Sequence, residues 1–187
     1  MNQRLGPFLV AVCIAACGSP PADITRDGSA EIQTHGLRYA ARHVHGGVEF
    51  TIPFTYANRS ADSLFLVNCS YGTRVGSRTV NRVDLSMVLQ KRTGGTWQTV
   101  WEAITSLCLS PPVWIAPGAT YTDTLRLFGG KPGRPVAPEL AVDRVAGEYR
   151  LVWQQLRRAR AGAAYPEGDT LPLDSRASNP FILTGGW

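Results

Sequence analysis

The sequence has few of the residues on which enzymes and metal sites depend. Histidine occurs three times in 187 residues, as His35, His43 and His45, and all three precede the first clear strand pattern. A catalytic triad is hard to assemble from them, and no Gly-x-Ser-x-Gly elbow is present to carry a nucleophilic serine. Gly129–Gly133 contains glycines and a lysine, but its proline and the lack of a following helix pattern do not fit a phosphate-binding loop. We therefore expect a non-enzyme.

The histidines also form no recognisable metal-ligand pattern. His43 and His45 would lie on one face of a strand, with His35 upstream, so copper or zinc binding is conceivable. No acid or cysteine nearby completes a ligand set, and solvated loop histidines are the simpler interpretation. We expect no metal and no other cofactor.

Charge and helical periodicity are both modest. The net charge is +5, which suits a solvated surface near anionic groups but does not call for nucleic acid. Only Gln154–Ala164 is a candidate helix, and it is mostly arginine and alanine. The apolar run Leu5–Ile14 is too short to span a bilayer as a helix.

The N-terminus has the organisation of an export signal. Arg4 precedes the apolar run, and small residues follow it up to Cys17. Ile14-Ala15-Ala16-Cys17 resembles the lipobox of bacterial lipoproteins. This resemblance implies that residues 1–16 are a signal peptide and that Cys17 carries a diacylglyceryl thioether, with fatty acyl chains such as palmitate. An ordinary secretory signal and a retained membrane anchor are the alternatives.

The same resemblance predicts the location and the domain organisation. Gly18 follows the cysteine, whereas Asp at that position retains lipoproteins at the inner membrane, so we expect the cell envelope, and the outer membrane if the cell has two. Residues 17–29, rich in Gly, Pro, Ser and Asp, are predicted to be a flexible tether. Residues 30–187 are predicted to form one domain.

Cysteine usage is consistent with export. Cys13 would leave with the signal and Cys17 would be lipidated, so Cys69 and Cys108 are the thiols left for the domain. In an oxidising compartment we predict that they form a disulfide, worth about 4 kcal/mol in the chain-entropy model. Free buried thiols or a mixed role are the alternatives.

Strand periodicity is found throughout the domain. Apolar residues alternate with others over Val48–Tyr56, where Pro53 requires an edge or a gap in the hydrogen bonding. Val83–Trp101 contains Thr93-Gly94-Gly95-Thr96, which is typical of a hairpin turn. With the later alternating segments, the sequence predicts an all-β antiparallel sandwich of about seven to eight strands.

Three short motifs resemble immunoglobulin-like domains. Gly147-Glu148-Tyr149-Arg150-Leu151 is similar to the penultimate strand, where the tyrosine hydroxyl bonds back to the preceding corner. Ile115–Gly118, followed by a strand of alternating polar residues, is similar to the start of the strand that precedes the penultimate one. Ser178–Leu183 is similar to the final strand. Leu151 stands where antibody domains have a cysteine, so a disulfide here would join other strands. The resemblance implies an immunoglobulin-like fold and no particular activity.

The longest predicted loop is Gln155–Ser178, between the last two strands of the sandwich. It contains Arg157, Arg158 and Arg160, whose guanidinium groups suit an anionic lipid head group, a surface glycan or an acidic protein. A solvated, variable insertion is the alternative interpretation.

A second predicted loop has the same two interpretations. Its arginines are Arg74, Arg78 and Arg82.

The tryptophans of the domain are expected mainly in the core, with a sugar-stacking platform as the alternative. They are Trp97, Trp101, Trp114 and Trp153.

Taken together, these features predict a membrane-anchored lipoprotein with a non-catalytic, immunoglobulin-like module that binds an anionic envelope component or a protein, or that supports envelope structure. A proteinase-inhibitor-like domain is an alternative. A metal-binding or hydrolytic accessory lipoprotein is another.

The lipid anchor yields a direct test. A Cys17→Ser protein cannot form the thioether, so it should lose its acyl chains and leave the membrane fraction, as measured by mass spectrometry and fractionation of cells. A variant that stays in the membrane fraction with its lipid would contradict the lipobox interpretation.

Overall fold

The computed structural model describes residues 31–67, 69–75, 78–84, 87–102, 112–130, 140, 145–159 and 168–186, with the backbone alone for 69–75 and 78–84. These residues form fourteen strands and one short 3₁₀ helix, Leu173–Arg176. The predicted all-β class is confirmed. All strand pairs between these elements are antiparallel except one.

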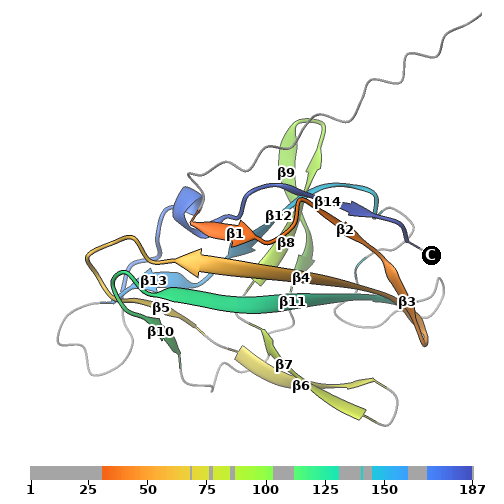
Figure 1. Cartoon of the computed structure of the whole chain (residues 1–187), viewed down its shortest axis with the longest axis horizontal. Coiled ribbons are helices and arrows are strands. Elements are labelled where there is room, and N and C mark those ends of the chain that lie inside the picture. The colour runs from red at the N-terminus through yellow and green to blue at the C-terminus, as the bar shows by residue number, and fades with distance from the viewer. Residues whose placement is uncertain are drawn as a thin grey trace, which may run out of the picture.

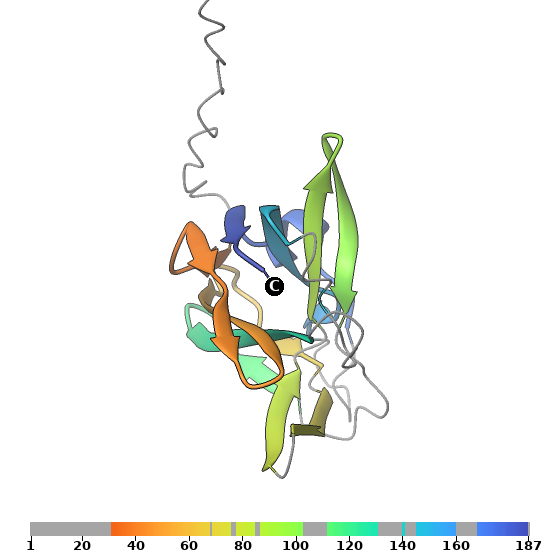
Figure 2. The same ribbon diagram turned by 90° about the vertical axis from the view of Figure 1, so that its right-hand side faces the viewer.

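Two main sheets pack against each other (Figure 1 and Figure 2). The first has the order β1-β4-β11, with β3 pairing with β4 beside β1. The second has the order β2-β14-β12-β8-β9. The bounds of the first are β1 (Ile32–Thr34), β3 (Arg42–Val44), β4 (Gly47–Ala57) and β11 (Thr120–Gly130); those of the second are β2 (Arg38–Ala40), β8 (Met87–Thr93), β9 (Thr96–Glu102), β12 (Gly147–Trp153) and β14 (Phe181–Thr184).

Two smaller sheets complete the described fold. A three-stranded sheet has the order β10-β5-β13, from β10 (Val113–Ile115), β5 (Leu64–Leu66) and β13 (Leu156–Arg158). A hairpin of β6 (Cys69–Val75) and β7 (Arg78–Asp84) extends from the body (Figure 1). The structure has more strands than the seven or eight predicted because several edge segments are short and change sheets.

The core follows the predicted alternation. Every second side chain of β4, from Val48 to Tyr56, is buried, as is the matching face of β12. The rings of Phe54 in the first sheet and Trp153 in the second meet edge to face, with centroids 5.7 Å apart. This contact links the inner faces of the two sheets in one hydrophobic cluster.

The gap expected at Pro53 is present. Its carbonyl oxygen accepts a hydrogen bond from the His35 backbone N–H, at 2.9 Å, just beyond the end of β1. The last residue of β1, Thr34, pairs with Phe54, and β3 pairs with β4 only from Glu49 back to Gly47. The proline nitrogen therefore faces the stretch between β1 and β3, where a missing donor costs no ladder bond.

The first strand region changes sheets, and a buried amide holds it in place. After β1 the chain crosses over, and β2 pairs in parallel with β14. At the crossing the Asn179 Oδ1 accepts from the Thr34 backbone N–H at 2.8 Å, and its Nδ2 donates to Thr34 Oγ1 at 2.9 Å. Both residues are buried. Asn179 thus joins the two ends of the domain.

Turns follow the expected chemistry in one case and not in another. Gly94 and Gly95 have φ of 57° and 84°, and they close the predicted β8–β9 hairpin.

The prediction of a helix at Gln154–Ala164 is wrong in the part that the structure describes: Gln154 and Gln155 form a turn, and β13 follows. Leu156 and its partner Leu66 are buried, so sheet pairing prevails over a weak helical pattern.

At the start of β12, the Tyr149 hydroxyl donates to the backbone carbonyl of Val145, the bond that the tyrosine motif predicts. Burial raises the pKa of Tyr149 from its ordinary value of 10.0 to about 12. Burial, followed by a hydrogen bond to a carboxylate, also raises the pKa of Tyr56 and of Tyr121. All three hydroxyls are therefore held in the neutral form by folding.

Asn179→Ala tests the crossing. The substitution leaves the buried Thr34 N–H without its acceptor, so the free energy of unfolding should fall by about 2 kcal/mol. Urea unfolding followed by circular dichroism measures this loss. Thr124→Ala, at an exposed position of β11, is the control and should change stability by less than about 0.5 kcal/mol. Equal stability of the two variants would show that the amide is dispensable.

Alkaline pH should destabilise the domain through Tyr149. A folded-state pKa above the unfolded value means that its contribution is complete below pH 10 and is lost as the pH rises towards 12. For this one group the loss is up to about 3 kcal/mol. The guanidinium chloride concentration at the midpoint of unfolding, measured between pH 10 and pH 12, should decline less steeply with pH for Tyr149→Phe than for the parent protein. Parallel declines would argue against the raised pKa.

Candidate functional site

The three-stranded sheet β10-β5-β13 presents two faces of opposite character. One face packs into the main core and carries Leu64, Leu66, Ile115 and Leu156. Because side chains alternate along a strand, the residues between them face the other way. In register across the three strands, this outer row consists of Trp114, Phe65 and Arg157. We call these three residues the small-sheet row.

An aromatic pair forms half of the small-sheet row. Phe65 is fully buried, whereas the neighbouring Trp114 is 56% exposed, the largest exposure among the big hydrophobic side chains that the structure describes. Their ring centroids lie 5.4 Å apart, at a tilt of 47°. Phe65 thus supports one side of an indole whose remaining surface is open to a ligand.

Arg157 forms the other half, and its side chain is fixed from the preceding turn. Its Nε and Nη2 both donate to Gln155 Oε1, at 3.1 and 2.5 Å. The contact holds the guanidinium group partly buried beside the aromatic pair. A planar, permanently charged group held in this way suits a carboxylate or a phosphate.

The predicted long loop is more ordered than expected where it is described. β13 pairs with β5 on one edge, and on the other edge Arg158 N–H donates to Asp169 O and Leu171 N–H to Leu156 O, both at 3.0 Å. The 3₁₀ helix then leads into Ala177, which bridges to Val152. The described residues of this stretch are therefore hydrogen-bonded to the sheets, while several of them, such as Asp169 and Asp174, are exposed.

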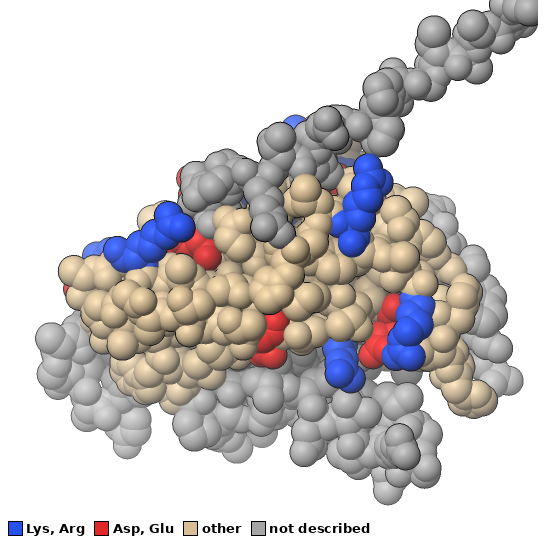
Figure 3. Space-filling view, viewed as in Figure 1, with Lys and Arg blue, Asp and Glu red and all other residues tan. Residues whose placement is uncertain are grey.

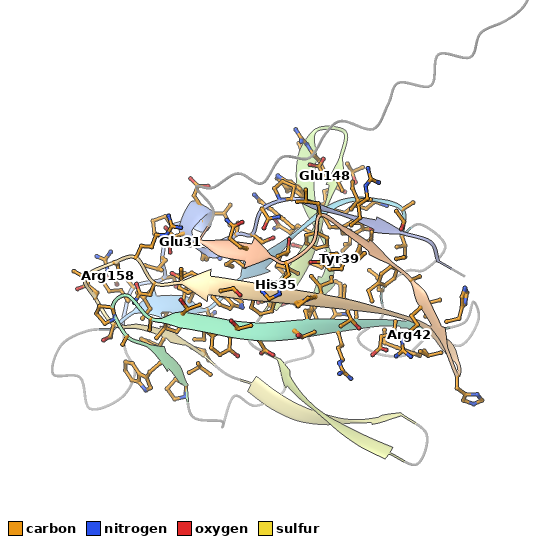
Figure 4. All side chains as sticks on the ribbon, in the orientation of Figure 1. Glu31, His35, Tyr39, Arg42, Glu148 and Arg158 are labelled. Atoms are coloured by element: carbon orange, nitrogen blue, oxygen red, sulfur yellow. The ribbon has the colours of Figure 1, made fainter. Side chains whose placement is uncertain are left out.

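The three arginines of that stretch have different environments. Arg157 belongs to the small-sheet row, and Arg158 contacts Asp62 at 3.0 Å with both side chains about half exposed. An exposed ion pair of this kind contributes little to stability, so Arg158 can exchange its partner. Figure 4 shows Arg158 at the end of the molecule formed by the small sheet. Arg160 lies outside the described residues.

Several other predicted sites cannot be placed, and one was predicted in the wrong form. Cys17 and Cys108 lie outside the described residues, and Cys69 begins β6 without a described side chain, so the lipid site and the disulfide stay predictions. Arg74, Arg78 and Arg82 do not form a loop, because they belong to β6 and β7, whose seven-residue strands pair along their full length.

The histidines do not share a strand face. His43 lies in β3, but His45 is in the tight turn before β4, so the expected pairing of the two imidazoles is wrong. Over the part of the chain that the structure describes, no group of three or more His, Cys, Asp or Glu side chains could hold a metal ion.

His35 instead belongs to a polar chain on the outer face of the first sheet. Its Nε2 lies 2.8 Å from Thr55 Oγ1, which lies 3.2 Å from Thr122 Oγ1. An imidazole beside a hydroxyl is one part of a nucleophilic site. Figure 3 shows this face with charged side chains only sparsely distributed. The His35–Thr55 pair is exposed.

The tryptophans divide between core and surface. Trp101 and Trp153 are buried, as predicted for core residues, whereas Trp97 is half-buried and Trp114 is exposed. A core position for Trp114 is wrong, because it lies on the outer face of a small edge sheet. The sequence carried no signal for this, because tryptophan is usually buried.

Among the described residues there is no helix long and apolar enough to cross a membrane. Comparisons of the chain with protein-family models, with curated proteins and with solved structures return no match.

Proposed function

We propose that the protein is a lipid-anchored component of the bacterial cell envelope whose immunoglobulin-like domain binds an anionic envelope ligand without catalysis. The lipobox-like sequence ending at Cys17 supports the anchor, and Gly18 favours the outer membrane where the cell has two. The fold and the small-sheet row support the binding role.

The strand order supports the immunoglobulin-like assignment. The first strand region is divided between the sheets, with β1 antiparallel to β4 and β2 parallel to the last strand, β14. The chain then crosses between sheets from β4 to β8 and from β11 to β12. The bond from Tyr149 to the Val145 carbonyl is the corner contact of that fold class. A Cys69–Cys108 disulfide would strengthen such a domain, and it remains part of the proposal.

The exposed indole of Trp114 beside the fixed guanidinium of Arg157 carries the functional proposal. An indole face stacks on the apolar C–H face of a sugar, while a guanidinium group pairs with its carboxylate or phosphate. Trp114 and Arg157 lie on the strands on either side of the fully buried Phe65, so a ligand that spans two strand spacings, about 10 Å, would reach both. An acidic glycan of the envelope has this combination of groups.

Site-directed variants of the small-sheet row test this role. Trp114→Ala and Arg157→Ser should each weaken retention on an immobilised polyuronate by about tenfold, because each removes one principal contact. Retention on envelope fractions should fall in parallel, as measured by elution of the full chain in a salt gradient.

The control removes the same charge elsewhere. Arg126→Ser lies on the outer face of β11, away from the row, and should elute with the parent protein. Unchanged retention of both site variants would refute the proposed surface. Binding of an acidic protein, with no retention on the polyuronate, would replace the glycan as the ligand.

A further inference from the structure

The β8–β9 hairpin stands apart from the small-sheet row and has a distinctive composition. From Met87 to Glu102 its ionisable side chains are Lys91 and Arg92, both close to the turn, and Glu102 at the opposite end. Figures 1 and 2 both show the turn end of the hairpin projecting from the body. A cationic tip therefore extends from a rigid sheet.

A tryptophan on the hairpin lies among guanidinium groups. Trp97 pairs in register with Arg92, whose guanidinium carbon lies 5.9 Å from the centroid of the indole ring. Arg150 of β12 approaches the same ring to 4.7 Å, and its Nε donates to Gln90 Oε1 at 2.8 Å. Trp97 and Arg150 are thus held as a preformed pair on the outer face of the second sheet.

The acidic groups near this cluster compensate it only weakly. Glu148 lies 3.4 Å from Arg92, at a site where the arginine side chain is 49% exposed, so the pair contributes little. Asp174 acts on Arg150 through space, while burial lowers the pKa of that arginine. A guanidinium group that has lost part of its hydration gains from a further anion.

The combination of groups matches one kind of partner surface. Tryptophan positions its ring among lipid head groups, and nearby arginine and lysine side chains bind anionic phosphates there. On β9, the edge strand that also carries Trp97, Val100 adds an apolar side chain that is 38% exposed. An acidic protein would satisfy the charges but would not require a tryptophan ring held beside them near a projecting turn.

The tether makes the membrane reachable. The chain between Cys17 and Glu31, where the described fold begins, spans at most about 50 Å when extended. Both views place the start of β1 and the hairpin turn in the upper half of the molecule (Figures 1 and 2). An anchored domain can therefore bring the tip to the same bilayer without unfolding.

We propose that the outer face of the β8–β9 hairpin near its turn, with Arg92, Trp97 and Arg150, docks on the anionic phospholipid surface of the membrane that carries the lipid anchor. The inference rests on the proposed function. Docking would orient the domain, leaving the small-sheet row facing away from the bilayer or along it, where an envelope glycan is accessible.

The test uses the full-length, lipidated protein with vesicles of phosphatidylcholine alone or mixed with phosphatidylglycerol whose acyl chains are brominated. Bromine quenches tryptophan at the depth of the chains and of the adjoining head groups. The parent should lose more fluorescence in the anionic vesicles than Trp97→Phe, with the difference abolished by high salt. Arg92→Ser should reduce salt-sensitive docking about fivefold, since one cation near the surface is lost.

Arg126→Ser is the matched control, because it removes one positive charge from the other sheet and should dock like the parent. Equal quenching of parent and Trp97→Phe, or equal docking of Arg92→Ser and Arg126→Ser, would overturn the proposal. The tip substitutions are at exposed or half-buried positions, and circular dichroism checks that the variants fold.

Failure of the anchor and failure of docking give different results. Loss of the anchor with an active tip leaves binding to the anionic vesicles alone, in a salt-sensitive form. An anchor without docking leaves binding to both vesicle types with no quenching that depends on Trp97. Binding to neither type overturns both proposals.

Discussion

The crossing between the two sheets at the start of the domain depends on one buried amide. Asn179 accepts a hydrogen bond from Thr34 N–H and donates one to its hydroxyl, with both residues buried. Since a buried polar group without a partner is costly, the two ends of the chain are held in a single arrangement. β1 can then pair with β4 in the first sheet while β2 pairs with β14 in the second. One short segment of chain therefore contributes a strand to each of the two sheets that enclose the hydrophobic core.

The aromatic core transmits this order to the surfaces that carry the proposed function. Trp153 of β12 contacts Phe54 and Tyr56 of β4, so the second sheet is held against the first. β13 follows β12 after a tight turn, and β5 follows β4, so the small sheet is aligned by the strands that precede it. The small-sheet row and the β8–β9 hairpin are therefore both connected to strands that pack in the same core.

Sequence patterns anticipated the parts of the fold in which local rules and burial agree. The alternation of β4, the Gly-Gly hairpin and the tyrosine bond of β12 were all predictable, because each depends on strand periodicity, positive φ or a short-range contact. The ordering of the Gln155–Ser178 stretch was not, since Leu156 pairs with Leu66, about ninety residues earlier in the chain. In the candidate site, the positive charge of the arginines predicted a possible binding surface. The exposure of Trp114 could not be predicted, because tryptophan is usually buried.

By itself the sequence determined the all-β class and the inner face of the long strands, because composition and alternation act over a few neighbouring residues. Only the tertiary structure decided which edge segments change sheets, that Trp114, Phe65 and Arg157 form one row, and that Arg150 meets Trp97 from another strand. These arrangements join residues far apart in the chain, and the physical reason is that strand pairing and burial select one long-range register among many with similar local propensity.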